Sequence, residues 1–265
     1  MIFDKKTTLA CECYAEKESH RGILTSVITH EGIEIVKTVV TKENEDGAQG
    51  SHTYLTICQG ELYHGGEFLR DKLSRAVSFS LCELIKELIP TPKRFLFVGL
   101  GNRELSSDKI GTGICDFLLP IHKKSVLHPS LSLFSPGILA SGGIRAIDHV
   151  KGLIQVCGFD AVIVADSLAT AHPERLLTTV QISSAGITPA SGTKISDEPT
   201  PNEEERADGA QEISRKALGV PVISLGVPTV ISFGDKLYTP YTIDGEIEPI
   251  CKIIADGITL ALCKE

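Results

Sequence analysis

The fold is decided by the stretch Arg94-Phe95-Leu96-Phe97-Val98-Gly99-Leu100-Gly101-Asn102 and by Arg103-Glu104-Leu105-Ser106-Ser107-Asp108, which follows it. A short apolar run ends in a glycine-flanked turn, and a signal for the start of a helix comes next, with an aspartate inside it. We interpret residues 94–98 as the first strand of a parallel sheet. This strand would deliver Asp108 to the carboxyl edge of the sheet, where ligands bind in open α/β folds.

Apolar strands alternate with amphipathic helices around this stretch. The predicted strands are 94–98, 161–165, 177–182 and 220–225, and the predicted helices are 66–89, 106–119, 145–157, 203–218 and 243–262. This alternation predicts an α/β fold with a mostly parallel, doubly wound sheet flanked by helices. Residues 184–202 are rich in Ser, Gly, Pro and Thr, and we expect them to form a mobile or functional loop.

Two segments near the N-terminus, 32–40 and 53–58, alternate apolar and polar residues with a period of two. This pattern is typical of half-buried antiparallel strands. Single domains of up to about 250 residues are ordinary. We therefore expect one domain over residues 1–265, in which 1–65 is a β-rich extension and 66–265 is the α/β core.

Composition and charge exclude several classes of protein. The net charge is -8 and no face of clustered Lys and Arg is available to neutralise phosphates, so nucleic acid is not expected as a direct partner. No apolar run reaches the roughly 18 residues of a membrane span, and the first residues lack a signal-peptide core, so we expect a cytoplasmic protein. The eight cysteines include no C-x-x-C pair, which favours reduced, structurally inert thiols over a zinc site.

Two aspartates are candidates for chemistry. Asp108 follows the strand over 94–98 and Asp166 directly follows the strand over 161–165, so their carboxylates would share one crevice if the strands are neighbours. Two nearby carboxylates do not both ionise freely, so one would act as a general acid while the other polarises a water, which suits peptide-bond hydrolysis. The alternatives are structural. Asp108 would be a partner of the helix dipole, kept ionised in the first helical turn, and Asp166 a loop acceptor.

The glycines of the central stretch invite a second interpretation. Gly99-Leu100-Gly101 could open a dinucleotide site, but that fingerprint requires a third glycine where Glu104 stands. The chain has no G-x-S-x-G elbow, no H-E-x-x-H helix and no phosphate-binding G-x-x-x-x-G-K-[ST] loop. We therefore expect no cofactor and no resident metal.

Several blocks of the chain resemble the germination protease family of spore-forming bacteria. Val98-Gly99-Leu100-Gly101-Asn102 and Ser107-Asp108-Lys109-Ile110-Gly111 are similar to the family's V-G-L-G-N and T-P-D-A-L-G-P. Near the N-terminus, Thr7-Thr8-Leu9-Ala10-Cys11-Glu12 resembles R-T-D-L-A-x-E. Further blocks in family order are Ser135-Pro136-Gly137-Ile138-Leu139, Asp166-Ser167-Leu168-Ala169, Glu174-Arg175, Thr178-Thr179-Val180-Gln181-Ile182, Ser191-Gly192 and Leu225-Gly226-Val227-Pro228-Thr229-Val230.

The resemblance implies an aspartate-dependent endopeptidase that degrades small acid-soluble spore proteins during germination. It implies a fold similar to the hydrogenase-maturation peptidases, which are phosphorylase/hydrolase-like, and it assigns the catalytic role to Asp108 and Asp166. The supporting and substrate-binding residues that it implies are Gly99, Gly101, Asn102, Ser135, Gly137, Arg175, Gln181, Ser191 and Gly192. The implied partner is a protein substrate in the spore core or forespore, and a homo-oligomer stays an open alternative.

The chain resembles a divergent, shorter member, because it departs from the family pattern at several polar positions. The family has Asp where Thr8 and Ser184 stand, Glu at Cys58, Arg at Ala171, an acid at Ser232, and Asn at Leu177 and Thr259. Two alternatives to an active endopeptidase therefore stay open. One is an inactive relative that binds spore proteins, and the other is a metal-assisted peptidase in which an aspartate and a histidine such as His122 recognise a metal in a partner protein.

Overall fold

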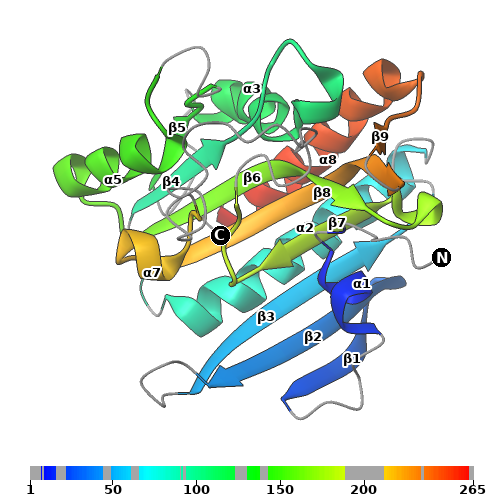
Figure 1. The fold of residues 1–265 in the computed structure, drawn as a ribbon, viewed down its shortest axis with the longest axis horizontal. Coiled ribbons are helices and arrows are strands. Elements are labelled where there is room, and N and C mark those ends of the chain that lie inside the picture. The colour runs from blue at the N-terminus through cyan, green and yellow to red at the C-terminus, as the bar shows by residue number, and fades with distance from the viewer. Residues whose placement is uncertain are drawn as a thin grey trace.

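A large mixed sheet runs through the molecule, with helices on both of its faces (Figure 1). The computed structural model describes Thr7 and residues 9–15, 22–43, 49–60, 66–89, 91, 94–122, 130–137, 143–188, 212–233 and 236–262. Within this part of the chain the strands are β1 Ile23–His30, β2 Ile33–Glu43, β3 Gln49–Cys58, β4 Arg94–Gly99, β5 Ser130–Phe134, β6 Ala161–Thr170, β7 Thr179–Ser183, β8 Val222–Phe233 and β9 Lys236–Tyr238. Their order in space is β1-β2-β3-β7-β8-β6-β4-β5, and β9 pairs with β8.

The predicted α/β class is confirmed, and the structure shows where the parallel part of the sheet lies. Strands β5, β4, β6 and β8 are parallel to one another, whereas β7 runs antiparallel to β8 and joins the sheet to the antiparallel strands β3, β2 and β1. A parallel return requires a crossover of about a dozen residues or more. The connection from β6 to β7, over residues 171–178, is shorter, so β7 enters the sheet in the opposite direction.

The two faces of the sheet carry different helices. The helices are α1 Ala10–Ala15, α2 Glu67–Leu88, α3 Ile110–His122, α5 Ala146–Cys157, α7 Arg215–Leu218 and α8 Ile243–Leu262, with short 3₁₀ turns η1 Ser106–Asp108 and η2 Pro173–Arg175. One buried cluster joins α2, α3 and α8 to the sheet through residues such as Phe95, Phe97 and Ile163. A second cluster joins α1, α5 and α7 to the opposite face through Val98 and Val164. Every residue of β6 is buried, because helices cover the sheet on both sides.

Periodicity predicted the long helices well and some boundaries poorly. The predicted helices over 66–89, 145–157 and 243–262 are confirmed as α2, α5 and α8. The predicted helix over 106–119 is instead a 3₁₀ turn followed by α3, and the strands predicted to end at 165 and 225 continue to Thr170 and Phe233. Of the helix predicted over 203–218 only α7 and the residues before it from 212 are described, and most of the predicted loop over 184–202 lies outside the described residues.

None of the described helices is both long enough and apolar enough to cross a membrane.

Helices α2 and α8 approach so closely that one glycine has no room for a side chain. A Cβ at Gly257 would lie 2.6 Å from Cγ1 of Val77 and 2.8 Å from the carbonyl oxygen of Ser74. The Ser74 hydroxyl also donates a hydrogen bond of 3.0 Å to the Ile253 carbonyl, which fixes the two helices together. Overpacking of this kind typically costs about 1–3 kcal/mol.

We therefore expect Gly257→Ala to lower the free energy of unfolding by about 1–3 kcal/mol, measured by urea denaturation. Gly245→Ala is the matched control, because Gly245 lies in the first turn of the same helix with no atom within 4 Å of its Cβ position. That variant should be as stable as the parent or more stable, since alanine favours a helix by up to about 1 kcal/mol over glycine. Equal stability of the two variants would contradict the close packing.

Candidate active site

Three backbone segments meet without intervening side chains at the end of β4. A Cβ at Gly99 would lie 2.3 Å from the carbonyl oxygen of Gly111, and a Cβ at Gly111 would lie 2.3 Å from the carbonyl oxygen of Ala165. The N–H of Leu100 donates to that same Ala165 carbonyl at 2.9 Å. We call Gly99–Asn102, with Gly111 and Ala165, the glycine junction. It joins the end of β4 to the start of α3 and to the middle of β6.

Gly101 brings the backbone of Asp108 to this junction. Gly101 has a φ of +103°, a backbone conformation that residues with a side chain rarely adopt. A Cβ there would lie 2.0 Å from the Asp108 carbonyl oxygen and 3.2 Å from Oδ1 of Asp108. The N–H of Asn102 donates to Oδ2 of Asp108 at 2.9 Å. The Asp108 carboxyl group is therefore held directly against the turn that follows β4.

Burial raises the pKa of Asp108. Desolvation of its carboxyl group is the cause, and the hydrogen bond from the Asn102 N–H offsets this only in part. The expectation that Asp108 lies in the first turn of the long helix, where the helix dipole would act on it, was wrong. Asp108 ends η1, and α3 begins only at Ile110, so Asp108 is not in the first turn of the long helix.

Asp166 lies inside β6, so the prediction that the strand ends before it was wrong. β6 continues because β8 continues beside it, pairing Asp166 with Gly226 and then passing a register shift between Leu168 and Ala169. Asp166 is only 2% exposed, and its Oδ1 accepts the N–H of Ser167 at 2.8 Å. Side chains alternate along a strand, so Asp166 faces the same side of the sheet as Val164 and Leu168, which is the side covered by α1, α5 and α7.

Both aspartates are thus connected to the glycine junction. Asp166 follows the Ala165 carbonyl that binds the Leu100 N–H, and Asp108 accepts the Asn102 N–H. η1 also packs against β6 and β8, and the Thr229 hydroxyl of β8 donates to the Ser107 carbonyl at 2.5 Å. Strands β4 and β6 are neighbours, with Gly99 paired to Ala165, so the condition set for a shared crevice is met.

Three of the predicted supporting residues have partners around this edge of the sheet. The Ser135 hydroxyl donates to the Gly99 carbonyl at 3.0 Å, and Asn102 accepts the Glu104 N–H at its Oδ1, also at 3.0 Å. Gln181 accepts the N–H of Ala10 at 2.6 Å. Gln181 also pairs with Gly226, the residue that pairs with Asp166, so Gln181 and Asp166 lie in one row across the sheet.

The other predicted supporting residues lie further out or outside the described structure. Gly137 has a positive φ of +72°, and no atom of the described residues lies within 4 Å of its Cβ position. Arg175 lies in η2, beyond the end of β6, and contacts α1 and the end of β3. Ser191 and Gly192 lie outside the described residues, as do the side-chain surroundings of His122.

Glu12 is an acid with a buried side chain that was not chosen as a candidate for chemistry in the sequence analysis. Its side chain is 3% exposed, and its oxygens accept the Thr170 hydroxyl and the Ala171 N–H, the latter at 2.9 Å. The Arg175 guanidinium lies 3.5 Å away as an ion-pair partner. These contacts hold α1 on the sheet at the end of β6. The signal for Glu12 was its place in the N-terminal block that resembles the family pattern.

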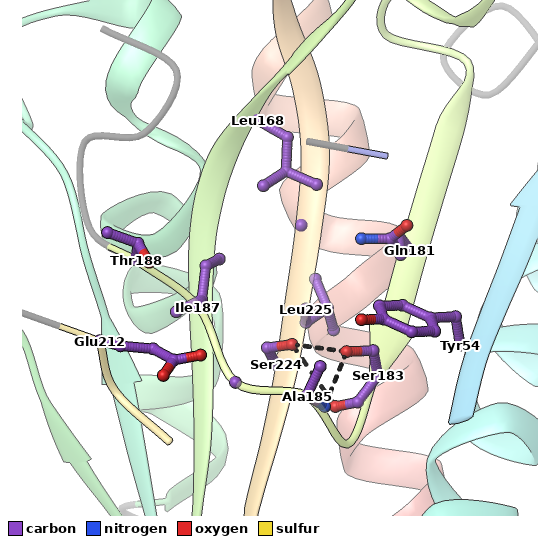
Figure 2. A pocket seen from close by; sticks show the side chains of 12 residues that line it. Tyr54, Leu168, Gln181, Ser183, Ala185, Ile187, Thr188, Glu212, Ser224 and Leu225 are labelled. Atoms are coloured by element: carbon purple, nitrogen blue, oxygen red, sulfur yellow. Dashed lines mark hydrogen bonds between the residues drawn. The ribbon is translucent and has the colours of Figure 1, made fainter. Parts of the chain in front are cut away.

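A hollow of about 240 Å³ opens beside the row that contains Gln181 and Asp166 (Figure 2). Gln181, Gly226 and Leu168 line one part of it, and Tyr54 and Glu212 line other parts. The hydroxyls of Ser183 and Ser224 face each other in Figure 2 and are hydrogen-bonded at 3.1 Å. Neither Tyr54 nor Glu212 was chosen from the sequence, because pairing between distant segments places them at the hollow. Tyr54 pairs with Ser183, and Glu212 precedes Ile213, which pairs with Ile187.

Among the described residues, no group of three or more His, Cys, Asp or Glu side chains is placed to hold a metal ion.

Comparison with known proteins places the chain among the proteases. The family model described as Germination protease matches residues 4–236. A germination protease of Clostridium perfringens (strain 13 / Type A) is 29% identical over 280 residues, which cover 83% of this chain and 82% of the relative. That of Caldanaerobacter subterraneus subsp. tengcongensis is 31% identical over 87% of this chain and 70% of its own length, and that of Bacillus pumilus is 31% identical over 81% and 57%.

The chain belongs to the germination protease family. Among solved structures, the [NiFe] hydrogenase maturation protease HycI from Thermococcus kodakarensis is similar over 66% of this chain and 98% of its own, at 16% identity and a TM-score of 0.36.

The raised pKa of Asp108 predicts how its replacement changes stability with pH. A carboxyl group whose pKa is raised in the folded state contributes stability to the protein at low pH. This contribution is lost as pH rises through the folded-state pKa. Asp108→Asn removes this loss and keeps an acceptor for the Asn102 N–H. We therefore expect the melting temperature of the variant, relative to the parent, to rise between about pH 4 and pH 7, by about 2–4 °C for each kcal/mol.

Asp148→Asn provides a control of opposite sign. The Arg145 guanidinium holds the pKa of the exposed Asp148 carboxyl below its ordinary value, so this acid contributes stability that is lost as pH falls. Relative to the parent, the melting temperature of that variant should fall as pH rises toward about 4 and then stay level between about pH 5 and pH 7. A difference for Asp108→Asn that stays constant or shrinks with pH would contradict the burial of its charge.

Proposed function

We propose that this chain is an endopeptidase that cuts small acid-soluble spore proteins, with Asp108 and Asp166 as its catalytic acids. The observation that carries the proposal is the attachment of both acids to the glycine junction in a member of the germination protease family. Family membership supplies the reaction class. The junction supplies a reason why these two carboxyl groups, far apart in sequence, are held at one edge of the sheet.

The two acids divide the labour in this proposal. Two carboxyl groups in one crevice do not both ionise freely, so one carries the shared proton, and we assign that proton to Asp108, whose pKa is raised. Asp166 then acts as the general base. It takes a proton from a water that attacks the scissile carbonyl carbon, and Asp108 gives its proton to the amine nitrogen as the C–N bond breaks. Two protons move and the acid and base exchange states, so a proton must return to Asp108 before the next turnover.

A row of residues runs across the sheet beside Asp166. Gln181 and Gly226 extend this row, and the Leu168 side chain packs over Gly226, 2.5 Å from the position of a Cβ there. The hollow beside that row offers space for one substrate side chain, with the Glu212 carboxylate at its edge. A protein substrate in the cytoplasm of the spore follows from the family, and we propose it on that ground.

Replacement of either acid should abolish most of the activity. We expect Asp108→Asn and Asp166→Asn each to lower kcat for cleavage of a purified small acid-soluble spore protein by at least about 100-fold, the usual contribution of a general acid or base. The double variant should be little worse than either single variant, because the two groups serve one step. Product peptides quantified by mass spectrometry provide the measurement.

Asp256→Asn is the matched control, because Asp256 lies on α8 and pairs with Lys252 on the surface. It should cleave at the parental rate. Parental cleavage by both single active-site variants would exclude the proposed roles, while folding of each variant is checked by its melting curve.

A binding protein without cleavage is the second candidate, and the changed family positions favour it. Ser184 stands where the family has an acid, and its hydroxyl accepts the N–H of Thr53 on β3 at 2.9 Å. This hydroxyl is used to join β7 to β3. Saturable binding of a spore protein with no product after long incubation of the parent would favour this candidate, and turnover that depends on Asp166 would exclude it.

A further inference from the structure

Two cysteine sulfurs meet at one nitrogen atom on the surface beyond the end of β6. Nη1 of Arg175 lies 3.1 Å from Sγ of Cys11, in α1, and 3.2 Å from Sγ of Cys58, the last residue of β3. Both sulfurs contact the same nitrogen, so the distance between them is at most the sum of these two distances. In the chain the two cysteines are separated by the 46 residues 12–57. All three residues lie outside the proposed catalytic pair.

The two thiols differ in exposure. Cys58 is exposed, and it also receives the hydroxyl of Thr179 at 3.6 Å. Cys11 is half-buried, and burial raises its pKa to about 11 although the Arg175 guanidinium acts in the opposite direction. A thiol reacts as its thiolate, and neighbouring cations and hydrogen-bond donors favour that form. Cys58 is therefore the sulfur that an oxidant reaches first, and Cys11 is the partner beside it.

Contacts that do not involve sulfur hold Cys11 in this position. On one side of it, the Ala10 N–H donates to Gln181, and on the other, the buried Glu12 carboxylate accepts the Ala171 N–H. The short helix α1 is thus fixed at both neighbours of Cys11. The sulfurs meet because of this docking, so their approach does not depend on a bond between them.

We propose that Cys11 and Cys58 form a redox modification site that a hydroperoxide converts to a disulfide. The Cys58 sulfur attacks the hydroperoxide, the O–O bond breaks, and a sulfenic acid forms while water or an alcohol leaves. The Cys11 sulfur then attacks the Cys58 sulfur, the S–O bond breaks, and water leaves with the Cys11 proton. The two thiols together lose two electrons and two protons to the hydroperoxide.

The Arg175 guanidinium explains why this pair suits oxidation better than metal binding. A cation between two sulfurs repels a metal ion that would take the same place. The disulfide would join α1 to β3 and hold α1 against the face of the sheet on which Asp166 lies. Oxidation of these thiols does not depend on the activity of Asp108 and Asp166.

Titration of the purified full chain with hydrogen peroxide, followed by mass spectrometry of peptides digested without reduction, tests the proposal. We expect a cross-linked peptide pair containing Cys11 and Cys58, with the loss of two hydrogen atoms and recovery of both thiols on reduction. The disulfide should also raise the melting temperature by at least about 5 °C, because it closes a long loop in the unfolded chain.

Variants of neighbouring cysteines separate this site from general thiol oxidation. Cys13→Ser is the matched control, since Cys13 is an exposed thiol on the same helix, and this variant should still form the cross-link. Cys58→Ser should lose it. A disulfide between Cys11 and Cys13, or oxidation of Cys58 to stable higher acids with Cys11 left as a free thiol, would overturn the proposal.

Discussion

The structure depends on the contact between three backbones at the end of β4. There is no room for a Cβ at Gly99, Gly101 or Gly111. The Ala165 carbonyl packs against Gly111 and also accepts the N–H of Leu100. A side chain at any of these glycines would separate β4 from α3 or from β6. The glycines are therefore needed for the fold, and a nucleotide is not required to explain them.

The same contact sets the electrostatics of the candidate site. Because Gly101 admits the backbone of Asp108, the carboxyl group lies half-buried against the turn, and desolvation outweighs the one hydrogen bond that favours its charged form. Asp166 is placed by the other side of the junction, within a strand that is buried on both faces. The proposed hydrolysis of a peptide bond would use these two acids as a proton donor and a proton acceptor.

Local pattern was enough to predict the α/β class, the strand over 94–98 and the long helices, because amphipathic periodicity depends on nearby residues. It failed where pairing is non-local. Nothing near Asp166 indicates that β6 continues to Thr170, since the extension depends on β8 continuing beside it. The buried position of Glu12 likewise depends on Thr170, Ala171 and Arg175, which are distant in sequence. The two acids were chosen from the sequence because each follows an apolar run, and their catalytic role stays a prediction.

The central claim is that Asp108 and Asp166 share one electrostatic environment through the junction. Carbon-13 NMR titration of the Asp108 carboxyl group, in the parent and in Asp166→Asn, tests this claim most directly. The account predicts that the pKa of Asp108 lies above its ordinary value in the parent and falls when the neighbouring carboxylate is replaced by an amide. A pKa of Asp108 that is the same in both proteins would contradict it.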